Sequence, residues 1–520
     1  MKLSLASALA VLTFVSALPT TSDKSLLVLH DVVQSHPVKT RWSWGWLKPI
    51  VDTEQLQATI YPDALRDRAK ILYNIAKGSI GEHGHPTRVI GSKGHTGTLD
   101  YILAELRLMA LYYTVDLQKF DAIDGRVKSF GLLVDGVLPK LLLVLALTPA
   151  TPHRKPVHAR LVLADNYGCD VSDFPADIAA GNIVLVARGE CSFGNKLVNA
   201  GKAGAAGVVI YDKEAPLHAT LGYPTGDEVP TVSISTEDAA KYIDALMKNP
   251  NRKFETTLYV DSYVKVVKTC NIIAETRSGD HNNVVSLGAH SDSVAEGPGI
   301  NDDGSGTISL LEVALQLTKF KVNNAVRFAW WAAEEEGLLG SYAYTNALTP
   351  EEKAKIRVFM DYDMMASPNY EYQIYDANNV DHPNGSGNLK ELYIDWYTKH
   401  GLKYTLVPFD GRSDYVGFID VGIPAGGIAT GAEGIKTKEG EQKFGGEAGK
   451  AFDPCYHQLC DNFDNPDYEA WVINTKLIAH SVAVYAQSLG SLPARDVAAA
   501  AKAPETFSSL LKFRATYAVL

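Results

Sequence analysis

Apolar positions recur at helical spacing near the start of the chain and gather into short buried runs further on. Between residues 52 and 76 they return every three to five positions, which predicts a helix or a pair of helices. The glycine-rich residues 91–97 favour a loop, and Leu99–Leu111 reads as another amphipathic helix. Tyr112–Val115 is strand-like.

A second unit is expected over residues 133–260. Within it, residues 181–193 and 196–211 follow the order strand, turn, small-residue helix and strand, which indicates a βαβ element. No Gly-Lys-Ser/Thr ending or dinucleotide fingerprint accompanies the glycines, so they favour close packing of a helix on a sheet. From about residue 264 to 489, short buried runs alternate with helical patterns. This alternation predicts an α/β fold with a largely parallel sheet.

The first 17 residues have the pattern of a signal peptide. The apolar run Leu3–Val15 is too short to span a bilayer and ends in a small-residue pattern, so we expect cleavage after Ala17. Residues 18–46 are expected to be a propeptide or linker. Asn384 begins an N-glycosylation triplet, which agrees with export. We therefore expect a protein that is secreted, with a vacuole as the second choice, and not anchored in a membrane.

Composition restricts the class of protein. The 520 residues suffice for two or three domains, and 46% hydrophobic with 21% charged residues is typical of a globular protein. The net charge of -11 and the lack of a basic stripe argue against nucleic acid as a partner.

Five cysteines suit an oxidising compartment. Cys455 and Cys460 flank a four-residue loop, and Cys169 and Cys191 lie 22 positions apart, so both spacings favour pairing. Cys270 is left over in a strand-like run, where we expect it to be inert.

Potential metal ligands follow several of the predicted strands. His290 stands at the end of the run 283–289, and Asp302 follows twelve residues later in a glycine-rich loop. Imidazole and carboxylate are ligands that zinc prefers. Taken alone, the segment is described nearly as well by a strand, a turn and a helix capped by Asp303 or Ser305.

Three further segments supply the same chemistry. Glu334, Glu335 and Glu336 come directly after an apolar strand, although an acidic run can also simply open a helix. Asp363 follows a third strand. His457 lies between Cys455 and Cys460.

Together these segments provide the ligands for two divalent ions that share one carboxylate. Two such ions can lower the pKa of a water and polarise a carbonyl group, with Glu334 as the general base. The chain has no His-Glu-x-x-His helix and no Gly-x-Ser-x-Gly turn, which disfavours single-zinc proteases and serine hydrolases.

Five motifs in this order resemble zinc metallopeptidase family 28, and more narrowly its secreted or vacuolar aminopeptidases, the aminopeptidase Y and fungal leucine aminopeptidase group. The resemblance covers nearly all of Asp52–Leu489, and residues 133–260 resemble the protease-associated (PA) domain inserted in that group. The motifs are Ala289-His-Ser-Asp-Ser, Gly299-Ile-Asn-Asp-Asp-Gly-Ser-Gly, Trp331-Ala-Ala-Glu-Glu, Tyr362-Asp-Met and Cys455-Tyr-His-Gln-Leu-Cys.

The resemblance implies a three-layer α/β peptidase domain with a mixed, largely parallel sheet between helices, and a smaller inserted PA domain. The peptidase domain would comprise residues 47–132 and 261–490, followed by a tail at 491–520. The apolar run Leu141–Leu147 and the tail fit the family pattern poorly.

The resemblance also implies residue roles. One zinc ion would take His290 and Asp363, the other Glu335 and His457, and Asp302 would bridge the two Zn²⁺ ions. The other roles fall on Glu334 as general base, Tyr456 as a donor to the oxyanion, Asp292 as the residue that orients His290, and Arg412 as part of the substrate pocket. Glu336 departs from the apolar residue usual in the family.

The implied activity is hydrolysis of N-terminal residues, preferably leucine and other apolar residues, from peptides with a free N-terminus, by a monomer. Three alternatives remain. A carboxypeptidase would need a basic cluster for the terminal carboxylate, and only Arg412 is a candidate. A glutaminyl cyclase would use one zinc, and a receptor-like module without activity would have lost ligands, whereas none is missing.

Overall fold

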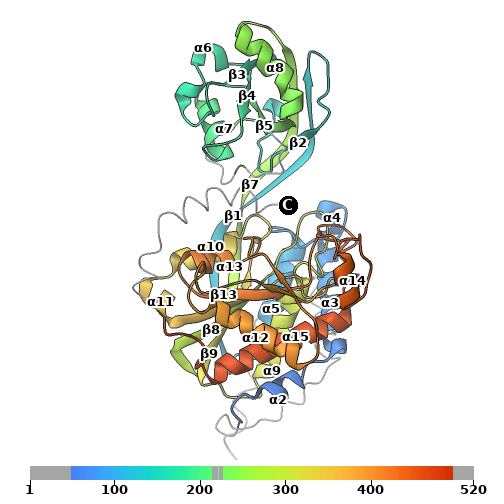
Figure 1. Cartoon of the computed structure of the whole chain (residues 1–520), viewed down its shortest axis with the longest axis vertical. Coiled ribbons are helices and arrows are strands. Elements are labelled where there is room, and N and C mark those ends of the chain that lie inside the picture. Colours follow the sequence, from blue (N-terminus) through green and yellow to red (C-terminus); the bar gives the residue numbers. More distant parts are fainter. Residues whose placement is uncertain (1–47, 213–220, 222–225, 496–520) are drawn as a thin grey trace, which may run out of the picture. The chain divides into compact units, whose positions relative to one another are not determined.

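A mixed sheet forms the centre of the larger part of the molecule (Figure 1). The computed structural model describes residues 48–212, 221 and 226–495, so the expected signal peptide, the segment 18–46 and most of the tail lie outside the described residues. The strands of this part are ordered β12-β11-β13-β10-β8-β9-β7, with β1 paired to β7. Their bounds are β1 Tyr113–Val134, β7 Glu255–Thr276, β8 Asp280–His290, β9 Asn324–Trp331, β10 Ile356–Tyr362, β11 Gln373–Tyr375, β12 Thr405–Val407 and β13 Ala425–Ala429.

The middle of this sheet is parallel and its edges are mixed. β8 runs parallel to both β9 and β10, and β10 runs parallel to β13, whereas β7 is antiparallel to β9 and β1. The carboxyl ends of β8, β9 and β10 therefore meet at one edge, where ligands bind in open α/β sheets.

Helices cover both faces of the sheet because its strands are apolar on both sides. In β9, Phe328 and Trp330 face one buried cluster, while Ala329 and Trp331 face another. The first cluster includes residues of α3 (Pro62–Ala76), α5 (Lys93–Leu108), α9 (Gly304–Leu317), α12 (Ser386–Lys399) and α15 (Tyr468–Gln487). The second includes residues of α10 (Leu339–Ala347) and α13 (Tyr415–Asp420), which completes three layers.

The second group of strands contains the expected βαβ element. β4 (Ile183–Ala187), α7 (Phe193–Lys202) and β5 (Gly207–Asp212) follow one another, and the two strands are parallel. β7 pairs with β3 at one end and β9 at the other, so this long strand belongs to both groups. The remaining strands and the principal helix here are β2 Leu142–Val144, β3 Val157–Leu163, β6 Thr231–Ser235 and α8 Thr236–Lys248.

One sequence-based expectation for the N-terminal part differs from the structure. The helix pair is present as α2 (Thr53–Gln57) and α3, but the glycine-rich loop expected at 91–97 is mostly the first turn of α5. Ser92 caps that helix by accepting a hydrogen bond from the His95 amide. A Cβ on Gly94 would lie 1.9 Å from the Thr87 carbonyl oxygen, so here glycine allows close packing and does not mark a loop. The further short helices are α4 Ile80–His83, α6 Ala176–Ala179, α11 Pro350–Lys355 and α14 Lys438–Phe444.

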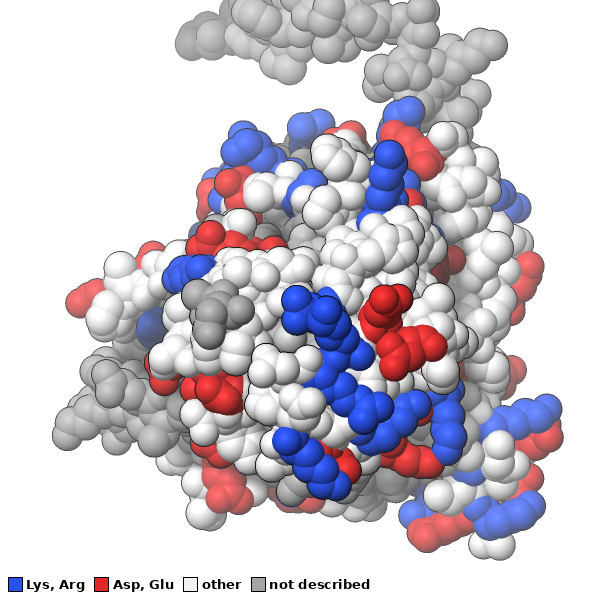
Figure 2. All heavy atoms as spheres, turned by 90° about the horizontal axis from the view of Figure 1, so that it is seen from above, with Lys and Arg blue, Asp and Glu red and all other residues white. Residues whose placement is uncertain are grey.

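Both expected disulfides are present, Cys169–Cys191 and Cys455–Cys460, and Cys270 is a free, half-buried thiol in β7. The face in Figure 2 carries acidic and basic side chains interspersed among uncharged ones. Among the described residues, none of the helices combines the length and apolar character needed to cross a membrane.

Candidate metal centre

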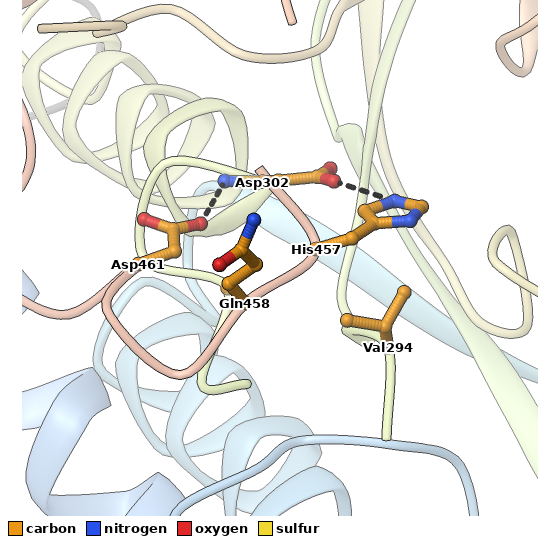
Figure 3. A pocket seen from close by; sticks show the side chains of 6 residues that line it. Val294, Asp302, His457, Gln458 and Asp461 are labelled. Atoms are coloured by element: carbon orange, nitrogen blue, oxygen red, sulfur yellow. Dashed lines mark hydrogen bonds and ion pairs between the residues drawn. The ribbon is translucent and has the colours of Figure 1, made fainter. Parts of the chain in front are cut away.

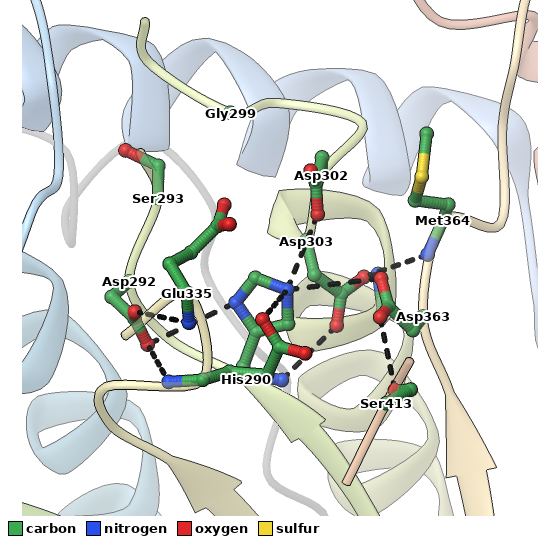
Figure 4. A network of polar contacts seen from close by, with 12 residues as sticks. His290, Asp292, Ser293, Gly299, Asp302, Asp303, Glu335, Asp363, Met364 and Ser413 are labelled. Carbon is green, nitrogen blue, oxygen red and sulfur yellow. Dashed lines mark hydrogen bonds and ion pairs between the residues drawn. The ribbon is translucent and has the colours of Figure 1, made fainter. Parts of the chain in front are cut away.

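His290 ends strand β8 and is fully buried. Its amide donates to Asp303 Oδ2 over 3.1 Å, and its carbonyl accepts a hydrogen bond from Thr307 Oγ1. Because Asp303 and Thr307 belong to the start of α9, the helix and the strand fix the backbone of His290 together. Its ring points into a cluster of carboxylates (Figure 4).

Asp302 presents its two carboxylate oxygens to two different imidazoles. Oδ1 lies 3.2 Å from His290 Nε2, and Oδ2 lies 3.1 Å from His457 Nε2. The two histidines come from chain segments more than 160 residues apart. The carboxylate therefore joins two half-sites, one around His290 and one around His457. This is the arrangement that a bridging ligand requires.

Each half-site contains one further carboxylate. Glu335 Oε2 lies 3.1 Å from His457 Nε2, and Asp363 Oδ1 lies 3.7 Å from His290 Nε2. Ser413 donates to Asp363 Oδ2 over 3.0 Å, which turns Oδ1 toward His290. Four chain segments thus bring His290, Asp302, Glu335, Asp363 and His457 together, as the sequence predicted.

These distances suit zinc. Ligand atoms about 2.0 Å from a tetrahedral ion are about 3.3 Å from one another, close to the separations of 3.1–3.7 Å here. Glu335 Oε1 and Asp363 Oδ1 are buried and accept no hydrogen bond from the described residues. Buried oxygens of this kind are costly unless a cation or donor satisfies them.

The electrostatics agree with a cation site. Burial opposes a charge on His290, but Glu334, Asp302 and Asp363 outweigh it and raise its pKa well above the usual range. For Asp302, hydrogen bonds from both histidines overcome burial and hold the pKa well below the usual range. Burial raises the pKa of Glu335, with the Asp302 charge adding to it and His457 opposing it. The excess of buried negative charge is what divalent ions would neutralise.

Glu334 lies beside His290 at nearly the same distance as Asp363. Its Oε2 is 3.8 Å from His290 Nε2, and burial raises its pKa well above the usual value, with Asp363 and Glu335 adding to the effect. A carboxyl group of raised pKa beside a metal site is suited to move a proton. Glu336 is partly buried; desolvation raises its pKa, and the charges of Asp292 and Glu335 add to the effect.

Asp292 lies closer to the backbone of Glu334 and Glu335 than to the His290 ring. Its oxygens accept the Glu334 and Glu335 amides at 3.3 Å each, whereas His290 Nδ1 is 3.8 Å away. Asp303, which sequence analysis considered only as a helix cap, accepts the amides of His290, Gly306 and Met364. It therefore ties β8, α9 and the end of β10 together, and its cap position was the one signal for it.

Tyr456 and Arg412 form a second group beside the cluster. Arg412 Nη2 donates to the Tyr456 hydroxyl over 3.3 Å, and its guanidinium is paired with Glu433 at 2.9 Å. The Tyr456 ring stacks on His457 with centroids 3.8 Å apart. Glu433 was missed because nothing in the sequence near it indicates a partner 21 residues away.

A small pocket opens beside Asp302 and His457, where the Asp461 carboxylate accepts a hydrogen bond from the Asp302 amide (Figure 3). The residues that line it are Val294, Gly299, Asp302, His457, Gln458 and Asp461.

Comparison with known proteins identifies the family. The model of peptidase family M28 matches residues 271–482, and that of the PA domain matches residues 157–242. Aminopeptidase Y of Saccharomyces cerevisiae is 53% identical over 461 residues, which cover 87% of this chain and 83% of that protein. The chain belongs to peptidase family M28. Leucine aminopeptidase 2 of Trichophyton rubrum, 42% identical over 87% of this chain and 90% of its own length, is a further relative.

Solved structures agree with the M28 fold. An aminopeptidase from Aneurinibacillus sp. strain AM-1 has a TM-score of 0.67 at 24% identity over 85% of this chain and 98% of that one. A zinc aminopeptidase from Bacillus subtilis has a TM-score of 0.54 at 26% identity over 82% of this chain and 97% of that one. The predicted mixed sheet between helices, the PA domain and the assignment as an M28 zinc aminopeptidase are confirmed.

Proposed function

We propose that this M28 enzyme binds two zinc ions per chain. One ion would be held by His290 and Asp363 and the other by Glu335 and His457, and Asp302 would contribute to both. The observation that carries this assignment is the carboxylate of Asp302, whose separate oxygens lie 3.2 and 3.1 Å from the two imidazoles. The donor set of imidazole and carboxylate is the one that zinc prefers.

Glu334 acts as the general base. When bound, the zinc ions would lower the pKa of the attacking water and polarise the scissile carbonyl. Glu334 takes the proton from that water on a carboxylate oxygen and passes it to the nitrogen of the leaving amine. Its burial supports this role, because a raised pKa brings the carboxyl closer to the operating pH.

Tyr456 supplies the hydrogen-bond donor for the oxyanion. Arg412 donates to the phenolic oxygen, so in this contact the hydroxyl group is the acceptor. Stacking on His457 fixes the ring beside a metal ligand. A donor positioned before the reaction stabilises developing negative charge without reorganisation.

The substrates are peptides with a free N-terminus, with leucine and other apolar residues preferred at that position. The cluster is rich in buried carboxylates, which favour an ammonium group over a terminal carboxylate. Aminopeptidase Y and leucine aminopeptidase 2, the relatives by name, support this choice.

The alternatives have less support. A carboxypeptidase would use Arg412 for the terminal carboxylate, but that guanidinium is already paired with Glu433. A glutaminyl cyclase with one zinc would not need a second set of ligands in addition to the first. A receptor-like module without activity would not require the complete ligand set.

We also propose the domain boundaries and the destination. Residues 1–17 are a signal peptide, 18–46 a propeptide or linker, 47–132 and 261–490 the peptidase domain, 133–260 the PA domain and 491–520 a tail. The PA match at 157–242 lies inside the proposed insertion. The enzyme is secreted, or else vacuolar, acts as a monomer and carries a glycan on the exposed Asn384. Asp292 holds the segment that carries Glu334 and Glu335, and helps to orient His290.

The function is tested with one substrate in two forms. A leucine arylamide should be cleaved, and activity should disappear when a zinc chelator is added or the substrate is N-acetylated. Cleavage of N-blocked peptides with a free C-terminus would instead favour the carboxypeptidase.

A further inference from the structure

A buried arginine outside all five motifs contacts the loop that joins His290 to Asp302. Arg88 lies between α4 and α5, and its side chain is completely inaccessible to solvent. A buried guanidinium is costly unless its donors are satisfied. The partly buried Arg68, by comparison, forms ion pairs with Glu105 and Glu312.

Arg88 instead donates to main-chain oxygens of the metal-site loop. Nη1 bonds the Ser291 carbonyl at 2.5 Å, Nε bonds that of Pro298 at 2.8 Å, and Nη2 bonds that of Gly299 at 2.5 Å. The Asp302 carbonyl lies 3.5 Å from Nη2. One planar group therefore holds both ends of the loop, next to the first ligand and at the bridging ligand.

The loop is closely fitted to this guanidinium. Gly299 has a φ of +58°, and a Cβ there would lie 2.1 Å from the Asp302 carbonyl oxygen and 3.0 Å from Arg88 Nη2. No side chain larger than hydrogen fits at this position without moving the loop. The glycine in the motif is thus explained first by the Asp302 carbonyl oxygen and by Ser293 Cβ, which a Cβ would approach to 2.6 Å, and only then by Arg88.

Asp461 accepts hydrogen bonds from the main-chain amides of the same loop. Its carboxylate accepts the amides of Asn301 and Asp302 at 2.8 and 3.0 Å, and its carbonyl accepts that of Ile300 at 3.0 Å. Asp461 is buried and lies four residues after His457. Three successive amides are therefore fixed to the segment that carries the other histidine ligand.

We propose that Arg88 and Asp461 are positioning residues that form a clamp on Asp302. Arg88 holds the carbonyl side of the loop and so sets Asp302 relative to His290. Asp461 holds the amide side and so sets Asp302 relative to His457. The guanidinium also places a fixed positive charge near Asp292, Asp302, Asp303 and Asp461, whose charges act on it. The inference rests on the proposed two-zinc site.

The clamp is tested by zinc affinity, measured by competition with a chromophoric chelator, together with the visible spectrum of the cobalt-substituted enzyme. Substitution of groups that orient metal ligands typically weakens metal binding about 10- to 100-fold. Arg88→Met should raise the zinc Kd by about that factor and alter the cobalt bands, and Asp461→Asn should act in the same direction. Arg88→Lys keeps the positive charge but loses the planar set of guanidinium donors. Its zinc Kd should therefore lie between those of Arg88→Met and the wild type.

Arg68→Met is the control, because it removes a partly buried, ion-paired arginine without touching the loop. It should lower thermal stability but leave the zinc Kd and cobalt spectrum unchanged. If Arg88→Met does not fold, Arg88→Lys carries the test alone. Wild-type zinc Kd in both Arg88 variants, or an equal rise in the Arg68 variant, would overturn the proposal. A wild-type enzyme that binds no zinc would instead overturn the proposed function.

Discussion

Asp302 Oδ2 lies 3.1 Å from His457 Nε2, although the two residues are 155 positions apart in the chain. The other oxygen of this carboxylate faces His290 at 3.2 Å. One side chain therefore connects the strand end at β8 with the disulfide-closed loop at 455–460.

Replacing the bridge should affect both ions. In Asp302→Asn the amide cannot offer two anionic oxygens, so zinc content should fall well below two per chain. Metal-ion catalysis contributes several kcal/mol, so kcat should fall at least about a thousandfold. Asp363→Asn is the comparison: it should weaken one ion and spare the other. Elemental analysis after dialysis measures both, and two retained ions in Asp302→Asn would contradict the bridge.

The disulfide Cys455–Cys460 should support metal binding because it closes the loop that carries Tyr456 and His457. The double substitution of these cysteines by serine should weaken zinc binding about tenfold or more and lower kcat.

The second disulfide provides the control for that experiment. Cys169–Cys191 closes a loop in the PA domain, and its removal should lower stability but leave kcat/KM within about twofold. Equal loss of zinc from both double variants would show that the effect is general unfolding.

Tyr456→Phe should slow turnover and leave the metals in place. Loss of one donor to an oxyanion typically lowers kcat about 10²- to 10³-fold. The Phe ring can still stack on His457, so KM and zinc content should stay near the wild-type values. Steady-state kinetics with a leucine arylamide measures the effect, and an unchanged kcat would remove Tyr456 from the mechanism.

Acid should destabilise the fold through His480 in α15. Burial, with the Lys399 charge, lowers its pKa to about 4, against about 6.5 in the unfolded chain. The unfolded state therefore binds more protons between these values, and stability falls as the pH decreases from about 6.5 to 4. The loss is up to about 3 kcal/mol, because each pKa unit corresponds to about 1.4 kcal/mol.

Thermal unfolding of His480→Gln and wild type, both with a chelator present, measures this contribution. The difference in Tm between the two should shrink or reverse as the pH falls through the window. A constant difference from pH 7 to 4 would show that His480 does not take up a proton on unfolding.

The proposed metal ligands could be picked out from sequence because three of them follow a recognisable buried strand, Asp302 lies in a glycine-rich loop and His457 lies in a short cysteine loop. His290, Glu335 and Asp363 combine a distinctive side chain with an apolar run that ends beside it. Parallel strands then bring those ends to one edge of the sheet. The alternation of buried runs and helices indicated that sheet for the same reason.

The supporting groups could not be predicted, because their contacts leave no local pattern. Arg88 bonds main-chain carbonyls about 200 residues away, and such acceptors are the same whatever the residue. Glu433 meets Arg412 only through the fold. Gly94 contributed to the wrong prediction of a loop at 91–97, because in a sequence a glycine that permits close packing looks the same as a glycine in a loop.

The zinc content and turnover of Glu334→Gln and Glu335→Gln, measured side by side, test the central claim most directly. Glu334 is proposed as the base and Glu335 as a ligand, and the two are adjacent in sequence. Glu334→Gln should keep two zinc ions per chain and lose nearly all turnover, whereas Glu335→Gln should lose zinc as well. Zinc lost from Glu334→Gln and retained by Glu335→Gln would reverse the two roles and contradict the account.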